Sequence, residues 1–119
     1  MSTVYRVEHP DCGHGPFNCF CNEKFHAFIA EHPVANEHPT LIEDLIPIKV
    51  KTKLSFEDLY SAVNTKRGIR QWFYDIYPEL RKAEFKLAVY KLVRAFPSFS
   101  GKQVFFTKNG RIPTYRGLP

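Results

Sequence analysis

The side chains best suited to chemistry gather near the start of the chain, between residues 6 and 21. They are one arginine, two acids, two histidines and three cysteines: Arg6, Glu8, His9, Asp11, Cys12, His14, Cys19 and Cys21. Thiolates and imidazoles bind metal ions such as zinc, a thiolate beside an imidazole is a nucleophile, and an arginine beside a glycine-rich loop binds phosphate. The sequence therefore offers three kinds of site.

A zinc site is one of these candidates. Its potential ligands form the motif C-x-H-x4-C-x-C and are Cys12, His14, Cys19 and Cys21. A structural zinc ion takes four such ligands in a tetrahedron, so the residue types fit. Paired ligands usually lie about two to four residues apart, and the C-x-C pair is closer. The competing interpretation is a loop of small, half-buried residues. Zinc is therefore an alternative, and the leading expectation is no cofactor.

A cysteine nucleophile is the second candidate. Cys12 or Cys21 with His9, His14 or His26 could form a thiolate–imidazole pair. Cysteine and histidine often lie close in sequence by chance, so this pattern identifies no catalytic residue.

A phosphate-binding loop is the third candidate. Arg6 lies on a predicted strand that leads into Gly13-His14-Gly15, where two glycines allow positive φ and close approach to a ligand. An arginine there could hold a phosphate or carboxylate through its fork of N–H groups. The dinucleotide fingerprint G-x-G-x-x-G is incomplete, and Pro16 removes one backbone donor. The alternative is that Arg6 pairs with Glu8 or with solvent.

The elements that must position these groups follow from the hydrophobic pattern. Alternating residues predict strands over 4–7, 48–54, 85–93 and 103–107, and helical spacing predicts helices over 22–31, 78–83 and from Ser55 to near Gly68. Asn22 and Ser55 are predicted N-caps. Asn109-Gly110 predicts a turn, and residues 111–119 a short final segment or tail. The order predicts an α+β fold with an antiparallel or mixed sheet of about four strands, covered by helices.

Composition sets the class of protein. A chain of 119 residues with 44% hydrophobic residues is long and apolar enough for one packed domain, residues 1–119, and unlike a disordered chain. The net charge of +5 permits a nucleotide, nucleic acid or acidic protein as partner without requiring one. Three closely spaced cysteines argue against a disulfide framework. With no apolar run of about 18 residues, we expect an intracellular, cytoplasmic protein in a reducing compartment, with no membrane partner.

Five short motifs along the chain resemble a group of small bacteriophage proteins. They are Tyr5-Arg6-Val7-Glu8-His9, Gly13-x-Gly15-Pro16-Phe17, Ser55-Phe56-Glu57-Asp58-Leu59, Phe85-Lys86-Leu87-Ala88-Val89-Tyr90 and Gln103-Val104-Phe105-Phe106. That group shares an opening Y-R-V-E, a G-x-G-P-aromatic loop, a K-S-like helix start and a closing Q-V-V-F strand. The resemblance covers most of the chain and implies a phage origin more strongly than any one function.

The layout also distantly resembles the ADP-ribosyltransferase fold. That resemblance implies that Arg6 would hold NAD, that Ser55 would mark a middle strand, and that Gln103 stands where the family has a catalytic glutamate. Glutamine cannot act as that carboxylate does, so the resemblance implies a nucleotide-binding scaffold more readily than an active transferase. The residues that would line its cleft are Arg6, His9, Gly13, Gly15, Phe17, Ser55 and Gln103.

These observations favour a small, non-catalytic phage-type accessory protein. We expect it to bind and modulate a host protein or complex, for example one of defence or nucleic-acid processing. The alternatives are a nucleotide-binding or ADP-ribosyltransferase-like domain that acts on NAD or a related nucleotide, and a zinc-stabilised interaction module. Nucleic acid is a further possible partner of the basic surface, although the aromatic residues fit a core pattern better than a stacking platform.

Overall fold

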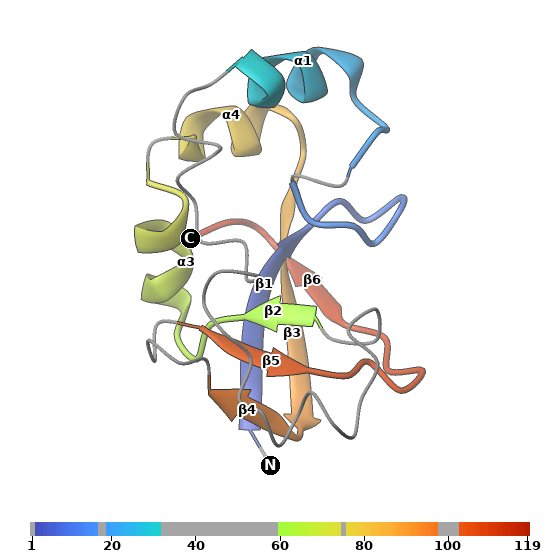
Figure 1. Ribbon diagram of the computed structural model, residues 1–119, viewed down its shortest axis with the longest axis vertical. Helices are drawn as coiled ribbons and strands as arrows, with labels where there is room; N and C mark the ends of the chain where they lie inside the picture. Colours follow the sequence, from blue (N-terminus) through green and yellow to red (C-terminus); the bar gives the residue numbers. More distant parts are fainter. Residues whose placement is uncertain (1, 17–18, 32–59, 75, 98–102) are drawn as a thin grey trace.

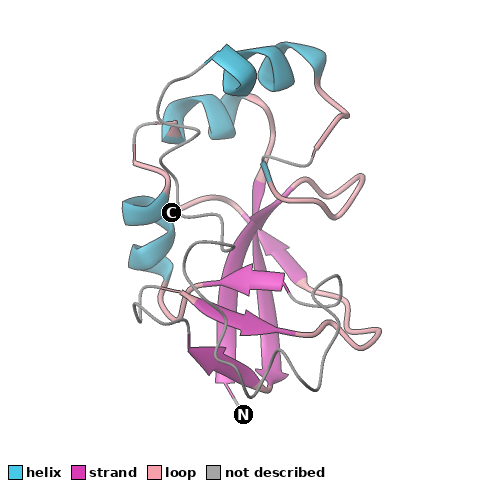
Figure 2. Cartoon of the chain, viewed as in Figure 1, coloured by secondary structure: helices cyan, strands magenta, loops and turns pink. Residues whose placement is uncertain are grey.

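The computed structural model of the chain combines short helices with two antiparallel sheets (Figures 1 and 2). It describes residues 2–16, 19–31, 60–74, 76–97 and 103–119. The predicted strand over 48–54 and the predicted helix start at Ser55 lie outside the described residues.

The first sheet has the order β1-β3-β6. Its strands are β1 (Ser2–Glu8), β3 (Lys86–Val93) and β6 (Thr114–Arg116). Glu8 lies opposite Lys86 in the β1–β3 register, and Ala88 of β3 lies opposite Tyr115 of β6. Because β3 is the central strand, it brings the first and last segments of the chain to its two sides.

The second sheet has the order β2-β5-β4. Its strands are β2 (Tyr60–Ala62), β4 (Ala95–Pro97) and β5 (Val104–Phe106). Val63, just after β2, exchanges two backbone hydrogen bonds with Tyr5 of β1, with N···O distances of 2.9 and 2.8 Å. This bridge joins the edges of the two sheets.

The described helices are α1 (Glu23–Glu31), α3 (Lys66–Trp72) and α4 (Tyr77–Lys82) (Figure 1). Asn22 caps α1, because its Oδ1 accepts a hydrogen bond from the Phe25 N–H at 3.0 Å. Thr65 caps α3 in the same way, through the N–H of Gly68 at 3.0 Å.

The side chains of β3 alternate between two apolar clusters. Leu87 and Val89 pack with residues of α1, α3 and α4, whereas Ala88 and Tyr90 pack with residues of β2 and β5. The first sheet therefore has helices against one face and the second sheet against the other. Arg6 and Glu8 lie two and four residues after Val4 on β1, so their side chains face the same side of the first sheet as Val4. Val4 packs in the cluster between the two sheets.

Most long elements were predicted correctly from the sequence. The strands over 4–7, 85–93 and 103–107 are confirmed as β1, β3 and β5, and the helices over 22–31 and 78–83 as α1 and α4. The turn at Asn109-Gly110 is confirmed by φ values of 47° and 77° and by the 2.7 Å hydrogen bond from Arg111 N to Lys108 O. The α+β class is therefore correct.

One prediction about the chain after residue 59 was wrong. The predicted helix toward Gly68 is replaced by β2, and Gly68 lies in the first turn of α3. The short final segment contains β6, and the described strands number six in two sheets, so the predicted count of about four in one sheet is not confirmed. β2 and β6 have three residues each, which carry little pattern of their own, and pairing with β5 and β3 makes them strands.

None of the helices in the described part of the chain is long and apolar enough to cross a membrane.

Candidate metal centre

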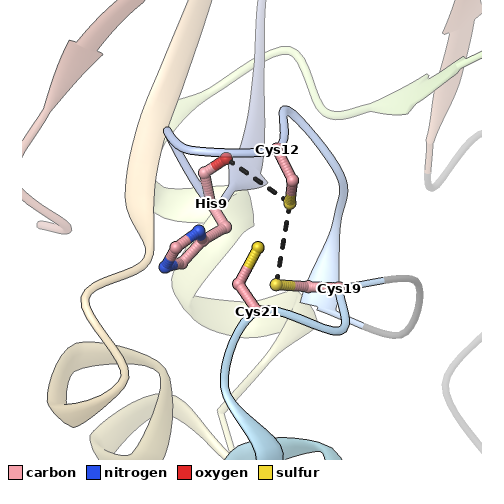
Figure 3. A group of neighbouring side chains, drawn as sticks. All are labelled: His9, Cys12, Cys19 and Cys21. Atoms are coloured by element: carbon pink, nitrogen blue, oxygen red, sulfur yellow. Dashed lines mark hydrogen bonds between the residues drawn. The ribbon is translucent and has the colours of Figure 1, made fainter.

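Four side chains with metal-binding atoms meet at the end of β1. We call His9, Cys12, Cys19 and Cys21 the Cys/His cluster, and one ligand atom of each lies within 4.8 Å of those of the other three. Figure 3 shows the three sulfur atoms gathered between the loop that carries Cys12 and the segment that carries Cys19 and Cys21, with the His9 imidazole beside them. Two thiols and the histidine are at least partly buried, and Cys21 is exposed.

The backbone after β1 folds into a tight loop that presents Cys12. The carbonyl of His9 accepts hydrogen bonds from the N–H groups of Cys12 and Gly13 at 3.2 and 2.7 Å, and the His9 N–H donates to His14 O at 2.9 Å. Gly13 has a φ of 71°, which a residue without Cβ adopts at little cost. Pro10 and Gly13 thus convert an extended strand into a turn whose backbone folds back on His9.

The distances between the sulfur atoms fit a tetrahedral site. Cys12 Sγ and Cys19 Sγ are 3.7 Å apart, and both residues are free thiols. Two thiolates on one zinc ion, each about 2.3 Å from the metal, are about 3.8 Å apart. The Cys12 sulfur also receives a hydrogen bond from the backbone N–H of His14 at 3.4 Å, and such a bond stabilises a thiolate. The loop therefore places Cys12 at the separation from Cys19 that one zinc ion would require.

His9 adds a nitrogen ligand that has no other use in the described part of the chain. The residue is 6% exposed, its ring packs edge-on against Phe85, and its Nδ1 is buried without a hydrogen-bond partner among the described residues. A buried polar atom without a partner costs free energy. A metal ion at the cluster would remove that cost.

The neighbouring cysteines oppose the ionisation of Cys21. Hydrogen bonding to Cys12, followed by burial and the neighbouring Cys19, raises the pKa of Cys21 to about 11. A cation bound beside Cys21 would act in the opposite direction and favour its thiolate.

The metal ligands predicted from the sequence need one change. Cys12, Cys19 and Cys21 come together as predicted, but the histidine beside them is His9, and His14 contributes its backbone N–H. The spacing His9-x-x-Cys12 separates two ligands by two residues, which is the usual interval in zinc sites. That signal was present in the sequence and could have identified His9.

A buried charged network adjoins the cluster on β1. We call Arg6, Glu8, Tyr90, Lys108 and Tyr115 the Glu8 network. The Glu8 carboxylate is 0% exposed and forms an ion pair with Arg6 Nε at 2.8 Å. It accepts hydrogen bonds from Tyr90 Oη at 2.6 Å and Tyr115 Oη at 2.9 Å, and it lies 3.5 Å from Lys108 Nζ. This one carboxylate joins β1, β3, β6 and the turn after β5.

The network changes the acidity of its members. Burial, and then the hydrogen bond to Glu8, raise the pKa of Tyr115 to about 12 and raise the pKa of Tyr90 further. Burial lowers the pKa of Lys108, although the Glu8 carboxylate acts in the opposite direction. Both phenols are therefore firm hydrogen-bond donors at neutral pH.

Arg6, the residue that the sequence placed at a phosphate site, makes its contacts inside the protein. Besides the pair with Glu8, it donates to Ser61 O at 3.3 Å and lies over the Tyr60 ring, 5.2 Å from the centroid. A Cβ at Gly15 would lie 3.3 Å from Arg6 Nη2, so this glycine makes room for the guanidinium. The alternative that pairs Arg6 with Glu8 is confirmed.

Arg6, His9, Gly13 and Gly15 of the predicted nucleotide cleft lie together at the end of β1, and the remaining residues lie elsewhere or are undescribed. Gly13 and Gly15 lie near Lys108 and Arg6 respectively. Gln103 precedes β5, at the opposite end of that strand from Lys108, and is buried. Phe17 and Ser55 lie outside the described residues. Nucleotide binding stays a prediction.

The described residues form a small α+β fold with two three-stranded sheets and a Cys/His cluster at the end of the first strand. The chain matches the family model described as Bacteriophage T4 Y00F protein over residues 1–113, and it belongs to that family. Comparisons with curated proteins and with solved structures found no match. The predicted phage grouping is thereby confirmed, and the ADP-ribosyltransferase likeness stays a prediction.

Proposed function

We propose that this protein is a non-catalytic phage accessory protein, stabilised by zinc, that binds a host protein or complex inside the cell. The observation that carries the proposal is the Cys/His cluster, with four ligand atoms within 4.8 Å of one another. Family membership supports the phage setting.

Zinc suits this donor set better than other common ions. Three thiolates and one imidazole are soft or borderline ligands, which zinc accepts in a closed tetrahedral site, whereas magnesium and calcium prefer oxygen. A site with four protein ligands leaves no open position for a substrate, so the expected role is structural. The ion would tie the end of β1 to the segment that enters α1.

An exposed aromatic side chain, that of Phe20, lies next to the Cys/His cluster. Phe20 lies between Cys19 and Cys21, and its side chain is 70% exposed. When both neighbours turn their sulfur atoms inward, the residue between them points outward. Its ring packs on His26 of α1 at a centroid distance of 4.6 Å, which holds it in place. Rigid exposed aromatic rings are typical anchors of protein interfaces. We therefore assign the binding role to Phe20 and its surroundings.

Metal content tests the zinc part of the proposal. Elemental analysis of protein purified with reductant should find about one zinc per chain, and cobalt in its place should show the absorption of a tetrahedral thiolate site. His9→Ala should lower zinc affinity, whereas His14→Ala, the matched control, should not. Less than a tenth of an equivalent of zinc after reconstitution would contradict the proposal.

Capture from host lysate tests the binding part. The wild type should retain a stoichiometric partner that Phe20→Ala loses. Tyr74→Ala is the control, because Tyr74 is as exposed, at 72%, and lies after α3. Absence of a stoichiometric partner, or equal retention by all three proteins, would contradict the assignment of Phe20.

A further inference from the structure

The Glu8 network holds more positive than negative charge. Arg6 and Lys108 are its two cations, and Glu8 is its one carboxylate. The side chain of Glu8 is fully buried, and those of Arg6 and Lys108 are 10% and 24% exposed. Among the described members of the network the net charge is thus +1. A partly buried charge without a counterion is unfavourable.

Lys108 faces the Cys/His cluster as well as Glu8. Its Nζ donates to Gly13 O at 3.3 Å, and Gly13 directly follows Cys12. Burial is the largest influence on the pKa of Lys108 and lowers it, whereas the charge of Glu8 and, to a smaller extent, that of Cys12 raise it. The turn at Asn109-Gly110 holds the lysine backbone in place, since Arg111 N donates to Lys108 O at 2.7 Å. The ammonium group therefore lies between the carboxylate and the loop of Cys12.

A zinc ion bound to the three thiolates would form a centre whose net charge is opposite to that of the Glu8 network. Zinc contributes +2, three thiolates contribute −3, and a neutral imidazole contributes nothing, so the centre has a net charge of −1. The network of net charge +1 lies next to it, because Glu8 and His9 are consecutive and Lys108 bonds to the loop. Together the two regions are neutral.

We infer that Lys108 is the outer-sphere cation of the proposed zinc centre, and that its ammonium group strengthens zinc binding by balancing the excess thiolate charge. This inference rests on the proposed zinc site. Lys108 is a positioning residue, because it acts on the metal through the loop and through its charge without being a ligand. Outer-sphere partners of this kind typically change metal affinity by about 10- to 100-fold.

The test measures zinc affinity by competition with a chromophoric chelator, using zinc alone as the probe. Lys108→Gln should bind zinc about tenfold more weakly than the wild type, and Lys108→Arg should restore most of the affinity because it keeps the charge. Lys91→Gln removes an exposed lysine of the same sheet and should leave the affinity unchanged. Circular dichroism checks that each variant is folded. If Lys108→Gln does not fold, Lys108→Met takes its place, since its stem can still pack on the Tyr60 ring.

The outcomes separate this inference from the proposed function. Zinc binding by the wild type with unchanged affinity in Lys108→Gln overturns the role of Lys108 alone. Failure of Lys108→Arg to restore affinity also overturns it, because the effect would then depend on shape and not on charge. No zinc binding by the wild type overturns both proposals.

Discussion

The Glu8 network and the Cys/His cluster lie side by side and differ in how they satisfy their polar atoms. In the network, four side chains converge on one carboxylate from strands and turns far apart in the sequence. In the cluster, the sulfur atoms contact each other weakly and the buried Nδ1 of His9 has no partner among the described residues. The buried carboxylate of the network is paired with groups of the protein itself, whereas the proposed zinc ion would be the partner of the cluster.

This difference sets the Glu8 network, which stabilises the fold, apart from the proposed zinc site. The ion pairs and hydrogen bonds of the network hold its members in place, and altering one of them leaves buried charges without partners. A buried nitrogen without a partner among the described residues, such as His9 Nδ1, costs free energy, and the proposed zinc ion would remove that cost. In the inference drawn above, the positive charge of the network balances the negative charge of the proposed zinc–thiolate centre.

Removal of the Glu8 carboxylate should have the largest effect. Glu8→Gln leaves Arg6 and Lys108 without their counterion, and we expect a loss of about 3–5 kcal/mol in the free energy of unfolding. Urea denaturation measures it. The control is Glu79→Gln, which breaks the exposed pair with Lys82 at 3.5 Å and should cost at most about 0.5 kcal/mol. Equal losses in the two variants would refute the structural role of the network.

Zinc binding should have the next largest effect on the free energy of unfolding. At a free concentration of about 100 times its dissociation constant, zinc should raise the free energy of unfolding by about 2.7 kcal/mol. Cys12→Ser should lose this increment and His14→Ala should keep it. Denaturation with and without a chelator measures both. A zinc increment that survives in Cys12→Ser would place the metal elsewhere.

Alkaline pH should weaken the network. The pKa of Tyr115 is raised from 10.0 to about 12, so between these pH values the folded protein keeps a proton that the unfolded chain has lost. The stabilisation is fully present below pH 10 and is lost as pH rises toward 12. Tyr115→Phe should lose about 1.5 kcal/mol at neutral pH, and its stability should fall less steeply above pH 10. Parallel pH curves for the two proteins would contradict this assignment.

Removal of a helix N-cap should have the smallest effect on stability. The two N-caps, Asn22 of α1 and Thr65 of α3, also allow a helix next to the cluster to be compared with one farther along the chain. Asn22→Ala and Thr65→Ala should each cost about 1 kcal/mol of stability, because each removes the hydrogen bond that caps a helix. Asn22 directly follows Cys21, so its replacement should also weaken zinc binding. Thr65→Ala should leave zinc affinity unchanged. Equal zinc affinities in both variants would show that α1 does not help to position the ligands.

The sequence predicted elements where local pattern and tertiary packing agree. β1 and β3 are long enough to show alternation, α1 has an N-cap and apolar spacing, and Asn109-Gly110 is a strong turn signal. β2, β4 and β6 have three residues each and carry too little pattern to be predicted. β5 is as short, but its valine and two phenylalanines are typical strand residues and identified it. At Tyr60–Ala62, pairing with β5 overrides a helical spacing.

The sequence predicted which types of residue form the candidate site, but it predicted only three of the four residues. Three closely spaced cysteines indicated a metal site, but His14 was chosen over His9 because it lies between the cysteines in sequence. The fold decided otherwise, since the loop turns back at Gly13 and brings His9 to the thiols. Arg6 and its pairing with Glu8 were recognised from the sequence. The other partners of Glu8, which are Tyr90, Tyr115 and Lys108, lie more than 80 positions away and could not be predicted.

The sequence by itself determined the α+β class, the long strands, the helix caps and a dense group of thiols and imidazoles near the start of the chain. These depend on spacing and residue type, which act over a few residues. Only the tertiary structure decided that His9 completes the Cys/His cluster and that Glu8 joins three strands and a turn. It also decided that Lys108 lies between the network and the cluster. Contacts between distant segments depend on strand pairing and sheet packing, which no local pattern encodes.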